Sequence, residues 1–218
     1  MSDFPIITAD KNSLKNRRLI YGVGNNNAPY MTNVKIDGKR IICPIYKIWT
    51  SMLRRCYAKT NRVGCETYHD CTVCSEWLDF MSFRAWVINQ KWKGMELDKD
   101  LKVFGARIYS PETCAFIPKQ INMLFSDSKK ARGKYPIGVT FSKKQGLFHA
   151  RVRKYGVLSH IGFFDNPNDA HNAYILEKTR HINEVASTCE DWIRDLVINY
   201  WESAFDSGKF KLVEGEYE

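Results

Sequence analysis

A basic stretch without a single acidic residue runs from Lys129 to Ile161. Its cationic side chains are Lys129, Lys130, Arg132, Lys134, Lys143, Lys144, Arg151, Arg153 and Lys154. Solvated faces normally mix charges of both signs, whereas a face of one sign favours a polyanionic partner. Arginine forks suit guanine edges and lysines suit phosphates, so this stretch predicts recognition of nucleic acid.

Period-two alternation divides the centre of this stretch into two sides. Within residues 148–153, Phe, Ala and Val alternate with His149, Arg151 and Arg153, so one side is apolar and the other cationic. The candidate DNA contacts are Lys143, Lys144, His149, Arg151, Arg153, Lys154 and His160.

Cysteines offer a second kind of chemistry. Cys71 and Cys74 have the spacing of half a zinc site, with Cys65, Cys56 and His69 nearby. A second closely spaced pair is missing and the surrounding pattern is that of core packing, so we predict no bound zinc. The seven cysteines are an odd, scattered number, which favours reduced thiols over a disulfide framework.

The elements expected in residues 1–125 end in a ββα order. The Asp37-Gly38 pair between apolar runs predicts a hairpin. Apolar residues at helical spacing predict one helix over 45–56 and a second, largely buried helix over 75–90. Residues 97–125 then show a strand, a turn at Gly105, a second strand and a short helix after Pro118.

A polar, basic linker is expected over 126–135, and a second module follows it. Three strands are predicted at 138–142, 148–154 and 159–164, followed by a helix for which Asn166 or Asn168 is the cap. The last helix, over 190–205, carries an apolar stripe. That stripe is either intramolecular core or a homodimer interface.

Residues 45–125 resemble the HNH endonucleases of phages and mobile introns, on the segments IWTSMLRRCY, TVCSEWLDFMSF and LDKDLKVFGARIYSPETCAFIPKQIN. The resemblance implies a ββα-metal finger in which Asp98 and Asn122 hold one Mg²⁺ or Mn²⁺. Asp98, Lys99, Thr113 and Asn122 then form the candidate catalytic set. Oxygen ligands of this kind suit a hard cation acting as a Lewis acid.

Two positions depart from the pattern of that family. Lys99 stands where the general-base histidine is usual, and Thr113 stands where an asparagine orients that base. Between Asp98 and Asp100 the lysine would stay protonated and steady a phosphate, so hydrolysis would need a metal-bound hydroxide or His69. The alternative for Asp98 and Asp100 is an ordinary pair of turn carboxylates.

Residues 135–183 resemble the Apetala or ethylene-response-factor type of DNA-binding domain, which phages commonly append to HNH nucleases. The resemblance rests on GV, FHARV, IGFF and DAHNAY in that order. It implies that a three-stranded sheet lies in the DNA major groove while the helix packs behind it.

We therefore expect an α+β protein with an HNH-like domain at 1–125 (core 97–125), the linker at 126–135 and a sheet-type DNA-binding domain at 136–218. The leading hypothesis is a metal-dependent endonuclease or nickase of the phage homing type that binds double-stranded DNA. The alternative is a catalytically degenerate DNA-binding regulator or anti-host protein. A net charge of +9 agrees with a DNA partner, and the absence of long apolar runs predicts no membrane partner and a cytoplasmic location. If the gene is phage-encoded, as the resemblance implies, that cytoplasm is the one of a bacterial host cell.

Overall fold

The computed structural model describes residues 4–58, 70–125 and 134–213, and it confirms the mixed α+β class. The chain divides into two compact units, Met1–Phe116 (the first unit) and Ile117–Glu218 (the second unit). The boundary lies upstream of the predicted domain end at residue 125, because Phe125 packs its ring 4.3 Å from that of Tyr200 in the second unit.

The first unit begins with α1 (Lys11–Lys15) and the hairpin of β1 (Asn33–Ile36) and β2 (Lys39–Ile42). Helix α2 (Pro44–Tyr57) confirms the predicted amphipathic helix, with proline in its first turn, where a missing N–H costs nothing. Trp49 of α2 is fully buried, and its indole Nε1 donates to the carbonyl of Trp77 at 2.7 Å. This bond helps to anchor α2 in the core of the unit.

The single helix predicted over 75–90 is wrong. The structure has a 3-10 turn, η2 (Ser75–Leu78), and a separate helix α3 (Phe80–Val87). Asp79 between them is extended, because the chain on both sides of it pairs with Asn25. Asn25 N donates to the Leu78 carbonyl, and Phe80 N donates to the Asn25 carbonyl. A contact between distant segments therefore breaks the helix.

Short strands complete the first unit. Strand β3 (Thr72–Val73) pairs in parallel with β5 (Ile108–Tyr109), and β4 (Glu96–Asp98) pairs with β6 (Ala115–Ile117). Helix α4 (Lys119–Leu124) follows directly after Pro118 and belongs to the second unit. The predicted ββα order is therefore present along the chain.

The second unit contains the predicted antiparallel sheet, β7 (Val139–Ser142), β8 (Leu147–Lys154) and β9 (Val157–Phe164), in that order. Helix α6 (Pro167–Ser187) covers one side of it, and Asn166 caps that helix by accepting from Asn168 N at 2.7 Å. Both the three-strand order and the Asn166 cap are confirmed.

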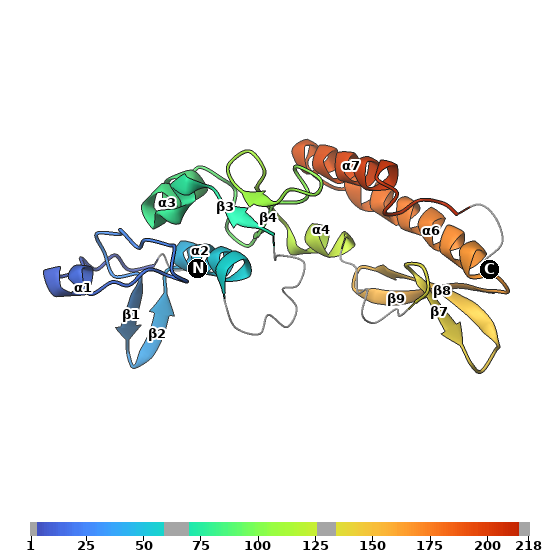
Figure 1. Cartoon of the computed structure of the whole chain (residues 1–218), viewed down its shortest axis with the longest axis horizontal. Helices are drawn as coiled ribbons and strands as arrows, with labels where there is room; N and C mark the ends of the chain where they lie inside the picture. Colours follow the sequence, from blue (N-terminus) through green and yellow to red (C-terminus); the bar gives the residue numbers. More distant parts are fainter. Residues whose placement is uncertain (1–3, 59–69, 126–133, 214–218) are drawn as a thin grey trace. The chain divides into compact units, whose positions relative to one another are not determined.

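Helix α7 (Asp191–Asp206) packs against α6 (Figure 1). Its apolar stripe is buried within the chain, at Ile193, Val197, Tyr200, Trp201 and Ala204. Intramolecular packing thus accounts for the stripe, and a homodimer through α7 stays a prediction that gel filtration would test.

Candidate functional site

The sheet of the second unit has one covered side and one open side. Ala150 and Val152 are buried against α6, at 0% and 1% exposure, while Arg153 is exposed and His149 and Arg151 are half-buried. We call the open side, made by Thr140, His149, Arg151, Arg153, His160 and Phe163, the outer face. The predicted alternation of β8 is confirmed.

A β-bulge determines which residues of β9 reach the outer face. Arg151 pairs with His160 but Ala150 pairs with Gly162, so Ile161 is an extra residue in β9. Without the extra residue, His160 and Phe163 would point to opposite sides. With it, both lie beside His149 on the outer face. Sequence periodicity gave no signal for the bulge, and Phe163 is therefore not among the predicted DNA contacts.

The two histidines of the outer face are in direct contact. His149 Nε2 and His160 Nδ1 share a hydrogen bond of 2.7 Å, and the His149 ring stacks on Phe163 with centroids 4.4 Å apart. Partial burial, Arg151 and His160 lower the pKa of His149. The outer face thus combines cationic forks with a flat aromatic surface.

Three predicted contacts differ in their surroundings. Arg151 Nη2 donates to Thr140 Oγ1 at 3.2 Å, which holds its fork on the outer face. Arg153 Nη1 donates to the Gly156 carbonyl at 2.6 Å. The prediction that Lys154 contacts DNA is corrected by the structure. Lys154 forms an ion pair with Glu177 of α6 and so lies on the covered side. Lys143 and Lys144 are exposed in the β7–β8 turn.

In the first unit, Asp98 lies at the end of β4 and its carboxylate holds the following turn. Its Oδ1 accepts the N–H groups of Asp100 at 2.9 Å and Leu101 at 2.7 Å. Burial, and to a lesser degree the negative charge of Asp100, raises the pKa of Asp98. The turn-carboxylate alternative therefore describes part of what this residue does.

Lys99 is a buried cation with two acceptors. The residue is 5% exposed. Its Nζ donates to Asp100 Oδ1 at 2.6 Å and to the Ala106 carbonyl at 2.7 Å. Thr113 Oγ1 donates to the Ile108 carbonyl at 2.7 Å and accepts from Ser110 N at 3.2 Å, which ties the turn between β5 and β6.

The predicted metal ligands fall in different units. Asp98 belongs to the first unit and Asn122 of α4 to the second. Among the residues that the structure describes, no three His, Cys, Asp or Glu side chains form a group that could hold a metal. Cys71 is buried, whereas His69 and Cys65 lie outside the described residues.

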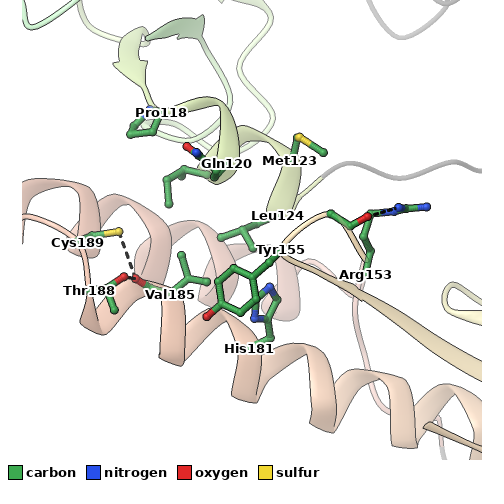
Figure 2. A pocket seen from close by; sticks show the side chains of 12 residues that line it. Pro118, Gln120, Met123, Leu124, Arg153, Tyr155, His181, Val185, Thr188 and Cys189 are labelled. Carbon is green, nitrogen blue, oxygen red and sulfur yellow. Dashed lines mark hydrogen bonds between the residues drawn. The ribbon is translucent and has the colours of Figure 1, made fainter. Parts of the chain in front are cut away.

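A cavity of about 570 Å³ lies within the second unit, and sequence reasoning did not foresee it. Leu124 and Met123 of α4, Tyr155 of the β8–β9 turn and His181 of α6 are among its lining residues (Figure 2). His181 is 1% exposed, and its Nδ1 has no hydrogen-bond partner among the described residues. The Tyr155 ring meets the His181 ring edge-on, with centroids 4.8 Å apart.

Comparison with known proteins gave no match to a family model, to a curated protein or to a solved structure. No helix within the described ranges is long and apolar enough to cross a membrane.

Proposed function

We propose that the chain binds double-stranded DNA through the outer face of the β7–β8–β9 sheet. The observation that carries this proposal is the asymmetry of β8: α6 covers the side of Ala150 and Val152, and the arginines occupy the other side. The flanking turn adds Lys143 and Lys144, and no acidic residue occurs between 129 and 161.

The geometry of the outer face suits a division of roles among its residues. Arg151, held by Thr140, presents a planar fork of the kind that pairs with guanine O6 and N7. The exposed lysines of the β7–β8 turn suit phosphates, which position a protein without reading sequence. His149 and Phe163 offer ring faces and an apolar edge suited to the methyl group of thymine.

Fluorescence anisotropy with duplex DNA over a range of salt concentrations tests this proposal. Affinity should fall steeply with salt, because phosphate contacts release counterions. Arg151→Gln with Arg153→Gln should weaken binding to the preferred sequence by about 2 to 6 kcal/mol, at roughly 1 to 3 for each bidentate pair.

The matched control is Arg180→Gln with Arg194→Gln, which removes the same charge from α6 and α7. Equal losses in the two double variants would show that net charge, and not the sheet, drives binding. Unchanged binding by the sheet variant would remove the outer face as the DNA-reading surface.

We further propose that the protein is an endonuclease or nickase of the HNH type. The supporting observation is the ββα order, in which the paired strands β4 and β6 are followed at once by α4, with Asp98 at the end of β4. A Mg²⁺ or Mn²⁺ ion, when bound, would supply Lewis-acid stabilisation of charge on the phosphate. Of the two predicted metal ligands, Asp98 is the one that lies in the first unit. Lys99 would act as a cation that supports a phosphate.

Incubation of supercoiled plasmid with the protein and Mg²⁺, Mn²⁺ or a chelator separates enzyme from binder. We expect metal-dependent nicking that Asn122→Ala abolishes while DNA affinity stays within about twofold, because binding comes from the sheet. Lys99→His should raise activity by restoring a base. If the wild-type protein and Lys99→His are both inert, the regulator role takes precedence.

A further inference from the structure

The hairpin of β1 and β2 is exposed along almost its whole length. Its turn is Asp37-Gly38, with φ of 48° and 77°, the left-handed pair that a tight two-residue hairpin requires. Val34 is buried at the base, whereas every residue from Lys35 to Ile42 is exposed. In Figure 1 the two strands stand out from the helices of the first unit. A two-stranded sheet of this kind gains little stability by itself in water.

The charges of the hairpin are unfavourable in the free protein. The pairing register sets Lys35 directly opposite Arg40, and like charges in that position destabilise a sheet. Lys39 adds a third cation, and Asp37 in the turn is the single acidic residue of 33–42. Lys35, Lys39 and Arg40 form no ion pair with any residue in the described part of the chain.

The orientation of Arg40 is nevertheless fixed. Its Nε donates to Asn33 Oδ1 at 2.9 Å, across the strand pair. Strand alternation puts Asn33, Lys35 and Arg40 on one side of the hairpin. The charge of Arg40 costs stability, yet its side chain is held in place. We therefore expect an anionic partner that neutralises this charge.

The opposite side of the hairpin carries exposed apolar surface. Ile36 and Ile41 are 36% and 39% exposed, beside Lys39. A two-stranded ribbon fits the major groove of duplex DNA, and the side with Lys35 and Arg40 is the one suited to guanine edges and phosphates. Charge complementarity and ribbon shape together select duplex DNA as the occupant.

We propose that the β1–β2 hairpin is a second DNA-contacting element, carried by the first unit and separate from the outer face of the sheet. The proposal rests on the proposed function, since it names the same duplex as ligand. It makes recognition bipartite, because each unit then brings its own β-structure to the DNA.

The test compares full-length variants on a mixed-sequence duplex over a series of salt concentrations. Lys35→Gln with Arg40→Gln should weaken binding roughly tenfold or more and lower the slope of log affinity against log salt by about one for each lost contact. The same variant should not melt at a lower temperature than wild type, because a like-charge pair has been removed. A merely structural role for the pair predicts the reverse.

The matched control is Lys11→Gln with Lys15→Gln, which removes two exposed cations from α1 of the same unit. It should change affinity by less than about threefold. Equal effects of the two double variants would overturn the proposal in favour of diffuse net charge. Hydroxyl-radical footprinting should also show a shorter protected region for the hairpin variant than for wild type.

Parallel measurements separate the failure of this inference from that of the proposed function. If the Arg151→Gln, Arg153→Gln variant loses affinity but the hairpin variant does not, the hairpin proposal fails and DNA binding by the sheet stands. If the full chain binds no duplex, both fail. Vesicles of phosphatidylserine and phosphatidylcholine test the competing anionic surface. Loss of vesicle binding with retained DNA affinity in the hairpin variant would overturn the proposal.

Discussion

The carboxylate of Asp98 has two uses that compete. It accepts two backbone N–H groups that fix the turn after β4, and it is also the predicted metal ligand of the first unit. Its neighbour Asp100 serves Lys99, whose buried amine needs a counterion. Asp98 and Asp100 look alike in sequence, but they have different roles in the fold. Asp98 fixes the turn, and Asp100 pairs with the Lys99 amine.

Asp98→Asn should stabilise the first unit slightly at neutral pH and abolish metal-dependent nicking. Burial and Asp100 raise the pKa of Asp98, so its ionised form costs stability as pH rises above the ordinary value for a carboxyl group. An amide keeps the accepting oxygen without the charge. Thermal melts and plasmid nicking measure the two effects.

Asp100→Asn is the control, and it should destabilise the first unit because it removes a carboxylate partner of the Lys99 amine. A lower melting temperature for Asp98→Asn would contradict this.

His181 should make the second unit less stable in mild acid. Burial lowers its pKa, as do Lys178 and Lys154, while Glu184 opposes them. The unfolded chain then takes up a proton at a higher pH than the folded one, so stability is present above about pH 6.5 and is lost as pH falls below it. His149, whose pKa is also lowered, adds to the same trend.

His181→Leu should flatten this dependence in part. Leucine fills the apolar surroundings of Val185 and Leu124 and removes a buried Nδ1 that has no hydrogen-bond partner among the described residues. Thermal melts of both proteins at pH 5 and pH 7.5 measure the difference. An equal loss of stability on acidification in the two proteins would show that His181 does not titrate on unfolding.

At the scale of the elements, the outer face depends on how closely α6 approaches the sheet. Ala150 and Ala170 are both fully buried at that contact, with Val139. Gly138 lies just before β7 with φ of 85°, and a Cβ there would come within 2.1 Å of the Tyr174 ring. Small residues on both sides thus let the helix support β8 from behind.

Gly138→Ala should destabilise the second unit by about 2 kcal/mol or more, from backbone strain and from displacement of Tyr174. Gly146→Ala is the matched control, because Gly146 also has a positive φ of 68° but meets nothing within 4 Å. Urea unfolding of both variants isolates the cost of the Tyr174 contact. Equal losses would show that only strain matters.

At the scale of the whole molecule, both units contribute cations on β-structure. The hairpin of the first unit and the sheet of the second each present one cationic side. The cysteines, by contrast, do not form an exposed surface in the described part of the chain. Cys43, Cys56, Cys71 and Cys114 are buried, and burial raises the pKa of Cys114 to about 12, which keeps it a thiol.

The purified protein should contain no stoichiometric zinc. Cys71 is a buried core residue of the first unit, and only one CxxC pair is present in the chain. Elemental analysis of the full chain measures this directly. One zinc per chain that disappears in Cys71→Ser would overturn the prediction.

Local patterns in the sequence were sufficient for several elements of both units. The alternation of residues 148–153, the Asn166 cap and the Asp37-Gly38 turn each depend on neighbours in the chain, and all three appear in the structure. The α+β class and the cationic side of β8 follow from the same short-range periodicities.

Contacts between distant segments decided the rest. Pairing with Asn25 divided the predicted helix at Asp79, and the bulge at Ile161 brought Phe163 beside His149. Alternation along β8 already puts Lys154 on the covered side, and the fold supplies its partner there, Glu177 of α6. The sequence determined which side chains were chemically able to act, because periodicity and turn chemistry are local. Only the tertiary structure decided which of them share a surface, because many of their hydrogen bonds and ion pairs are formed with residues far away in the chain.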